Sequence, residues 1–393
     1  MKRINLFFSF YILVVIALFI FSFTQVDLSL TLSQGSIYQS LQKSLQYVGF
    51  FQRPLSALIF SVISVFLFLF YLAFLYLVKK DKLKITTTKI LVLLTFLILV
   101  FSYNAFSYDL FNYIFDAKIL THYSQNPYLH KPTDFANDPM LNFMRWTHRL
   151  YPYGPSWLVL TVPLSFIGFN FFLPTFFLFK AMIGLTFLGS VYLVYKISSI
   201  LFPKNAIFNT VFFAFNPLIL IEGLISSHND FPLIFFALLA IYLYLLKKKS
   251  FSFASLLFSI GVKFSTVVLV PVFALVLYFE KIKKNIPWEN IFLLSLIFSL
   301  VAVLLATLRT TFQPWYLIFP LTMSAFISKK TYIFIPSFIA SVFMILIYIV
   351  YVFMTDYAKE YPNIISNIEY VGLLTVVITT LVLVVRSKVS IKH

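Results

Sequence analysis

The sequence predicts an all-α bundle of transmembrane helices, a polytopic membrane protein that crosses a bilayer about 10 to 13 times. Of the 393 residues, 61% are hydrophobic and only 11% are charged, whereas a soluble domain usually carries about 25% charged residues. The apolar residues gather in runs of about 20, the length that a membrane-spanning helix needs. We expect one transmembrane domain over residues 1–393, with a long polar loop at about 104–155.

Each predicted span is an apolar run bounded by polar or basic residues. The runs of suitable length and composition are 5–24, 55–78, 88–104, 174–196, 206–226, 231–247, 289–308, 331–354 and 370–386. The first run can also be interpreted as a signal peptide, but no small-residue cleavage site follows it, which favours a retained helix.

Three further apolar stretches are short or interrupted. Gly261 and Lys263 break the stretch 253–280, which predicts two short helices that return to the side they left. The stretch 156–172 contains a proline and favours an element that re-enters the membrane or lies in its outer interface. The stretch 314–328 is also short, so the number of complete crossings depends on these three.

The distribution of charge predicts the orientation. The net charge is +17, but the basic residues cluster at the ends of apolar runs, as the positive-inside rule expects, and this argues against nucleic-acid binding. These clusters include Lys79 to Lys89, Lys247 to Lys249 and Lys281 to Lys284. We therefore expect a multi-pass protein of the cytoplasmic (inner or plasma) membrane, with most acids on the extracytoplasmic side. The absence of cysteine excludes disulfides, cysteine–zinc sites and thiol nucleophiles.

The polar loop begins with a stretch that has helical periodicity. Asp109, Asn112, Tyr113 and Asp116 recur at a spacing of three or four residues, with apolar side chains between them. This pattern predicts an amphipathic helix in the membrane interface, holding Asp109 at the mouth of the bundle. The alternative is a surface helix whose acids merely face water. A second interfacial helix is expected around residues 37–51.

A second polar cluster, Ser226 to Asp230, lies where two predicted spans meet, on the same side as Asp109. Such a cluster is costly at a span boundary unless it is solvated or used, although a tight polar turn is the alternative. Glu222 lies about one turn before it, at membrane depth, where a turn does not need a carboxylate.

Two basic residues lie close to apolar sequence. Lys263 is far from either charged end of its stretch and needs an anionic partner or a water-filled cavity, snorkelling being the alternative. Arg309 follows the run 289–308 and has the shape to clamp a phosphate. Trp315 and Tyr316 come soon after it and can also be interface anchors.

Taken in order, these motifs resemble a known family. The motifs are Asp109, Asn126-Pro127-Tyr128, Tyr151-Pro152-Tyr153-Gly154-Pro155, Asn216-Pro217, Glu222, His228-Asn229-Asp230, Gly261-Val262-Lys263 and Pro314-Trp315-Tyr316. The set resembles the C-class (GT-C) membrane glycosyltransferases, closest to the bacterial polyprenol-phosphate-mannose-dependent mannosyltransferases. The chain departs from the pattern at Phe111, where the family often has a second acid, and at Phe264, where it usually has proline.

The resemblance implies transfer of a sugar, with mannose favoured, from a polyprenyl-phosphate donor to an extracytoplasmic glycolipid, glycan or protein acceptor, with inversion. Asp109 would be the general base. The residues expected to bind substrate are Tyr113, Asp116, Asn126, Tyr128, Glu222, His228, Asn229, Asp230, Lys263, Arg309, Trp315 and Tyr316. Some relatives use a divalent metal such as Mg or Mn, but too few carboxylates stand in register here to predict a metal site.

Two other functions use similar substrates. A transporter or flippase of lipid-linked sugars should show paired halves with interrupted helices, and no such symmetry is visible in the sequence. A cell-surface glycan polymerase or ligase shares the lipid-linked donor, and the sequence separates it poorly from the transferase.

Overall fold

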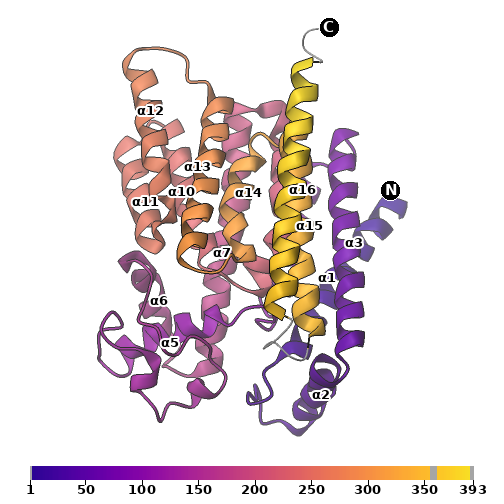
Figure 1. Ribbon diagram of the computed structural model, residues 1–393, viewed down its shortest axis with the longest axis vertical. Coiled ribbons are helices and arrows are strands. Elements are labelled where there is room, and N and C mark those ends of the chain that lie inside the picture. Colours follow the sequence, from indigo (N-terminus) through magenta and orange to yellow (C-terminus); the bar gives the residue numbers. More distant parts are fainter. Residues whose placement is uncertain (1, 355–360, 390–393) are drawn as a thin grey trace. The chain divides into compact units, whose positions relative to one another are not determined.

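The computed structural model describes residues 2–354 and 361–389, and within these ranges the chain forms helices and no strand. The predicted all-α class is therefore confirmed. The helices, labelled in Figure 1, divide into two compact units. The first comprises the described parts of Met1–Ile59, Ile90–Ser190 and Ile221–Phe264, and the second those of Phe60–Lys89, Val191–Leu220 and Ser265–His393. The expected single domain over 1–393 stays a prediction.

The first unit contains most of the polar loop. Its elements, some of which continue into the second unit, are α1 (Lys2–Ser22), α2 (Ser36–Gln46), α4 (Ile85–Leu99), α5 (Asp109–Thr121), α6 (Pro155–Ile167), α7 (Phe172–Leu201), the π-helix η6 (Ile221–Ile225), α10 (Asp230–Leu245) and α11 (Lys249–Val262). Helices α10 and α11 pack side by side, as do α5 and α6. The interfacial helix expected around residues 37–51 is present as α2 and the turn that follows it.

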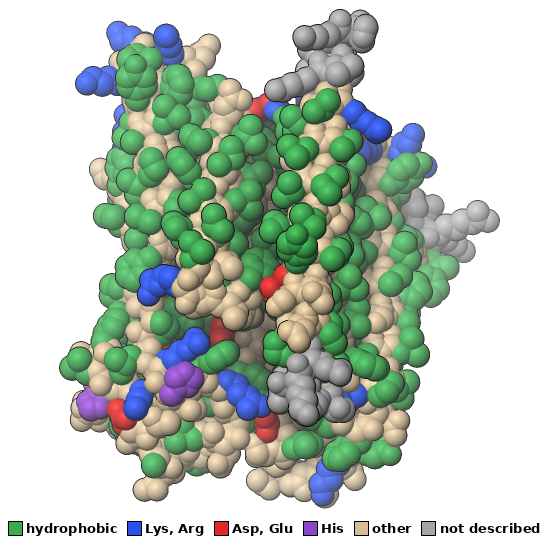
Figure 2. Space-filling view, viewed as in Figure 1, with side chains coloured by type: hydrophobic (Ala, Val, Ile, Leu, Met, Phe, Trp, Pro, Cys, Tyr) green, Lys and Arg blue, Asp and Glu red, His purple; other side chains and the backbone are tan. Residues whose placement is uncertain are grey.

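The second unit combines long and short apolar helices. They are α3 (Arg53–Lys79), α8 (Ala206–Ala214), α9 (Pro217–Leu220), α12 (Val270–Lys281), α13 (Trp288–Arg309), α14 (Ile318–Ala325), α15 (Thr331–Phe353) and α16 (Tyr361–Val389). Figure 2 shows hydrophobic side chains along the visible face of α16, where Leu373 and Leu381 are about three-fifths exposed. A helix that exposes this much apolar surface along its length faces lipid, so the chain is a multi-pass membrane protein.

The number of crossings depends on the shorter helices. In the described residues seven helices are long and apolar enough to span a bilayer, or eight if one bent pair is counted. Four shorter apolar helices, α4, α6, α10 and α11, add to these. The expected 10 to 13 crossings are reached only if some of these four also cross, and that number stays a prediction.

The run 206–226, predicted as a span, is a bent pair of helices. Its two halves, Pro203–Ala214 and Pro217–Ile225, meet at an angle of 57°. Pro217 has no backbone N–H to continue the helix, and the side-chain oxygen of Asn216 accepts a hydrogen bond from the Leu218 N–H at 3.0 Å. Asn216-Pro217 therefore breaks the helix, and η6 follows in a new direction.

The break predicted within 253–280 is confirmed. Helix α11 ends at Val262, and Lys263 takes an extended conformation. The α6 segment has 13 residues and is about 20 Å long, too short to cross a 30 Å hydrocarbon core. This agrees with the expectation that 156–172 does not cross.

Two glycines bring the start of α6 against the end of α11. A Cβ atom on Gly154 would lie 2.2 Å from the carbonyl oxygen of Gly261, and the Gly154 N–H donates to the Val262 carbonyl at 3.4 Å. Since the obstacle is backbone, it cannot rotate away. This contact fixes the loop before α6 beside the segment that carries Lys263.

Gly154→Ala is expected to destabilise the protein by about 1–3 kcal/mol, the usual cost of overpacking, and to lower the thermal unfolding temperature in detergent. Gly35→Ala is the control, because its Cβ would meet the Ser33 hydroxyl at 3.7 Å, an ordinary contact. Equal unfolding temperatures for the two variants would contradict the close approach.

Candidate active site

Asp109 begins α5 and is held there by its own loop. Its backbone N–H donates to the Ser107 hydroxyl at 3.1 Å, and the Asn104 side-chain amide donates to the Ser107 carbonyl. A carboxylate in the first turn of a helix also benefits from the helix dipole. The loop between α4 and α5 thus fixes where the Asp109 carboxylate lies.

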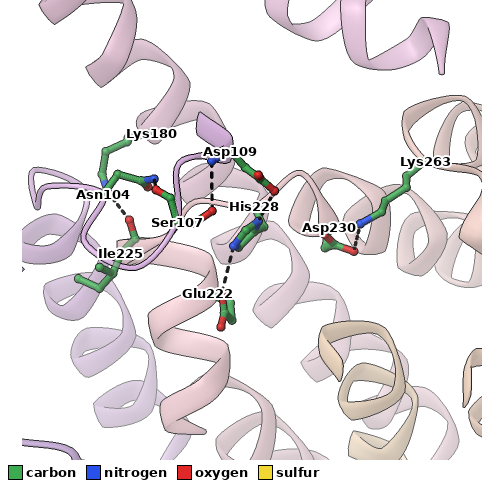
Figure 3. Close-up of polar contacts among 9 residues, drawn as sticks. All are labelled: Asn104, Ser107, Asp109, Lys180, Glu222, Ile225, His228, Asp230 and Lys263. Atoms are coloured by element: carbon green, nitrogen blue, oxygen red, sulfur yellow. Dashed lines mark hydrogen bonds and ion pairs between the residues drawn. The ribbon is translucent and has the colours of Figure 1, made fainter. Parts of the chain in front are cut away.

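His228 lies between two carboxylates from different parts of the chain (Figure 3). Its Nδ1 is 3.5 Å from Asp109 Oδ2, and its Nε2 is 3.2 Å from Glu222 Oε2. His228 and Glu222 are fully buried, whereas 13% of the Asp109 side chain is exposed. We call Asp109, His228 and Glu222 the acid–histidine cluster. Within it, only the Asp109 carboxylate is open to a reactant.

The local backbone explains this arrangement. Glu222 lies in the π-helix η6, and its carbonyl accepts the His228 N–H at 3.1 Å. Ser227 takes a left-handed conformation with φ of 53°, which is uncommon for a residue other than glycine. A π-helix followed by a strained residue is a recurrent feature of functional sites.

The two carboxylates keep His228 charged. Burial alone opposes the charged imidazolium, but the contacts with Asp109 and Glu222 outweigh it and raise the pKa of His228 to about 9. At neutral pH His228 is therefore a cation placed between two acids.

Asp230 and Lys263 form a second ion pair in the same unit. The Lys263 ammonium is 2.9 Å from both carboxylate oxygens of Asp230. Asp230 begins α10 and Lys263 follows α11, and their side chains are 6% and 22% exposed. The expectation that Lys263 needs an anionic partner is confirmed.

The turn between η6 and α10 contains polar side chains that the protein does not satisfy. Among the described residues, the hydroxyls of Ser226 and Ser227 and both polar atoms of the Asn229 amide are buried without a hydrogen-bond partner in the protein. An unsatisfied buried polar group costs about 1–3 kcal/mol. Such a group of donors and acceptors beside His228 has the chemistry to bind sugar hydroxyls.

Asp116 differs from its expected setting. The wet face predicted for the helix that starts at Asp109 is wrong at Tyr113 and Asp116, which are only 1% and 5% exposed. The helix is covered by packing of the loop and of α6, which sequence periodicity cannot reveal. Burial, and then the charge on Asp109, raise the pKa of Asp116 to about 8, so its carboxyl holds a proton at neutral pH.

Asp116→Asn is expected to change the turnover number at pH 7 by less than about tenfold, because an amide replaces an already neutral acid. Between about pH 4 and 8 the stability of the wild type should fall relative to that of the variant, because the unfolded carboxyl ionises near 3.9 while the folded one keeps its proton. Above about pH 8 the difference in stability should no longer change. Thermal unfolding of both proteins at pH 5, 7 and 9 measures this. A constant difference would refute the neutral carboxyl.

Tyrosine side chains surround these acids. The Tyr113 ring packs edge-on against Tyr153 at 5.3 Å and Trp157 at 5.1 Å. Burial, followed by the charges on Asp109 and Asp116, raises the pKa of Tyr153 well above its usual value. Tyr153 was not among the predicted site residues, although its motif was. Its hydroxyl stays neutral and can donate to a substrate.

The other predicted residues lie elsewhere. The Asn126 side chain accepts from the Tyr128 N–H at 2.9 Å, and the exposed Tyr128 donates its hydroxyl to the Tyr153 carbonyl at 3.2 Å. Arg309, Trp315 and Tyr316 belong to the second unit, where Arg309 is exposed and the two rings meet edge-on. Their participation in the site stays a prediction.

One buried cation was missed from the sequence. Lys180, in the middle of α7, is only 1% exposed and donates hydrogen bonds to Ser102, Leu224 and Ile225. The available signal was the same as for Lys263: a lone lysine inside an apolar run. No group of three or more His, Cys, Asp or Glu side chains suited to a metal ion occurs in the described ranges, and the metal requirement stays open to test.

The comparisons with known proteins place the chain in a family. No curated protein and no solved structure matches it. The family model described as alpha-(1->6)-mannopyranosyltransferase, N-terminal domain, matches residues 23–279. That range contains the acid–histidine cluster, the Asp230–Lys263 pair and Lys180. Because more than half of the 393 residues match, the chain belongs to the alpha-(1->6)-mannopyranosyltransferase family, a family of C-class membrane mannosyltransferases, and is a glycosyltransferase.

Proposed function

We propose that the protein transfers a mannosyl group from a polyprenyl-phosphate donor to an acceptor hydroxyl on the extracytoplasmic side, with inversion at the anomeric carbon. The single observation that carries the proposal is the partly exposed Asp109 carboxylate, held by a buried histidine that a second buried acid supports. Family membership supports the mannosyl group.

Asp109 acts as the general base. The acceptor oxygen attacks C1 of the sugar, and its proton passes to the Asp109 carboxylate. The bond between C1 and the phosphate oxygen breaks with its electron pair, which leaves polyprenyl phosphate as a free anion. Positioned general-base help is worth about 100- to 10,000-fold in rate.

Lys263 offers positive charge to the leaving phosphate. Its ammonium is partly exposed and already engages one anion, Asp230. A phosphate oxygen that approaches can share this ammonium, which stabilises the charge that develops as the bond to C1 breaks. The unsatisfied Asn229 amide and the two neighbouring serine hydroxyls are the proposed partners of the sugar hydroxyls.

The proposed location follows from charge. Basic loops such as Lys247 to Lys249 mark the cytoplasmic side, which leaves the loop with Asp109 outside. The membrane is then the cytoplasmic (inner or plasma) membrane. The partners are the lipid-linked donor, a glycolipid, glycan or protein acceptor, and membrane lipid.

The test is transfer by the purified full chain in proteoliposomes. Labelled polyprenyl-phosphate mannose is supplied with a glycolipid acceptor, and wild type is compared with Asp109→Asn, with and without a chelator. The proposed transfer is supported if the wild type consumes the donor and Asp109→Asn does not. If the label only moves across the bilayer without transfer, the flippase function replaces it, and loss of activity with chelator identifies a metal requirement.

A further inference from the structure

Lys180 occupies an unusual place for a lysine. It lies within α7, an apolar helix long enough to span a membrane, and its side chain is almost completely buried. Placing an ammonium at such a position is costly, and an apolar side chain would fill the same space without that cost. The lysine must therefore supply something that packing alone does not.

The Lys180 Nζ makes three hydrogen bonds. It donates to the Leu224 carbonyl at 2.9 Å, the Ile225 carbonyl at 3.0 Å and the Ser102 hydroxyl at 3.2 Å. Leu224 and Ile225 end the π-helix η6, so the lysine caps carbonyls that the interrupted helix leaves open. The Ser102 hydroxyl donates its own proton to the Leu99 carbonyl at 2.6 Å, which leaves its oxygen to accept from Lys180.

This network joins the two chain segments that meet in the acid–histidine cluster (Figure 3). Ser102 begins the short loop that leads through Asn104 and Ser107 to Asp109. Ile225 begins the turn that leads to His228. Figure 3 shows Lys180 beside Ile225, to whose carbonyl it donates.

We infer that Lys180 is a positioning residue for the contact between Asp109 and His228. Its hydrogen bonds join the start of the loop that leads to Asp109 with the start of the turn that leads to His228. The inference rests on the proposed role of Asp109 as the base. Without these hydrogen bonds, each segment is free to shift by a fraction of an ångström to an ångström, and a misplacement of about 1 Å far from the reacting atoms can cost 100-fold in rate.

Lys180→Met keeps the length of the side chain and removes the charge and the donors. We expect the turnover number to fall by at least tenfold, up to about 100-fold, with the KM for donor changed by less than about twofold. The pH at which activity falls on the alkaline side should drop from near 9 towards 6.5, because His228 loses the carboxylate contacts that raise its pKa. Lys196→Met, on the same helix, is the matched control and should behave as wild type.

A double variant separates positioning from general destabilisation. If Lys180 acts through His228, the Lys180→Met/His228→Gln protein should be no slower than His228→Gln alone. If Lys180→Met does not accumulate in membranes, Ser102→Ala removes one anchor of the same network and should move the alkaline midpoint in the same direction.

An unchanged alkaline midpoint in either variant, or rate losses that multiply in the double variant, would overturn the inference. The activity of Asp109→Asn distinguishes failure of this inference from failure of the proposed function. An inactive Asp109→Asn protein beside a fully active Lys180→Met protein defeats the positioning role alone, whereas an active Asp109→Asn protein defeats the base.

Discussion

Asp109→Asn is expected to lower the turnover number by about 100- to 10,000-fold, because the amide cannot accept the acceptor's proton. The KM for the lipid-linked donor should change little, since the variant keeps the shape of the side chain. Mannosyl transfer at saturating donor and acceptor, in single-turnover and steady-state experiments, measures both quantities.

The matched control is Asp134→Asn, an acid of the same loop that pairs at the surface with His130. It should leave the turnover number within about twofold, as exposed pairs contribute little. A protein that keeps full activity without the Asp109 carboxylate would show that another group takes the proton.

Much of this arrangement was predictable from the sequence. Apolar runs of adequate length predict helices in lipid, because a bilayer leaves the backbone no other way to satisfy its polar groups. The same cost makes polar residues at span boundaries conspicuous, which is why Asp109, His228 and Glu222 stand out. Their meeting in one cluster is a finding of the structure, which places His228 3.5 Å from Asp109 and 3.2 Å from Glu222.

Other features depend on contacts distant in sequence. The burial of Asp116 results from packing around α5, and periodicity along one helix cannot distinguish a wet face from a face covered by a loop. The angle of 57° at Asn216-Pro217 could not be predicted, because a proline within an apolar run marks a kink without giving its size. The partners of Lys180 could not be predicted, because two of its acceptors are backbone carbonyls. Every residue has a backbone carbonyl, so the sequence does not show which ones a lysine will contact.

His228→Gln is expected to reduce both activity and stability. Glu222 is fully buried, and removing the imidazolium leaves its carboxylate without the partner that offsets its burial, at a cost of about 3–5 kcal/mol. Asp109 also loses the side chain that contacts its carboxylate at 3.5 Å. We therefore expect a lower thermal unfolding temperature and a turnover number reduced by about 100-fold.

The double variant Glu222→Gln/His228→Gln should be more stable than His228→Gln, because it removes the uncompensated charge together with its partner. Thermal unfolding in detergent compares the three proteins. If the double variant unfolds at a lower temperature than His228→Gln, the cluster is not an ion pair but a packing contact, and the charge on His228 has no structural role.

The pH dependence tests that charge directly. Since the folded pKa of His228 is raised to about 9 from about 6.5 in the unfolded chain, its contribution to stability is complete below about pH 6.5 and is lost by about pH 9. The difference in unfolding temperature between wild type and His228→Gln should narrow across that window.

The activity of the wild type should persist to higher pH and fall only as the folded imidazolium loses its proton near pH 9. In Glu222→Gln this fall in activity should begin at lower pH. A wild-type enzyme that loses activity near pH 6.5 would instead show a histidine that neither carboxylate stabilises.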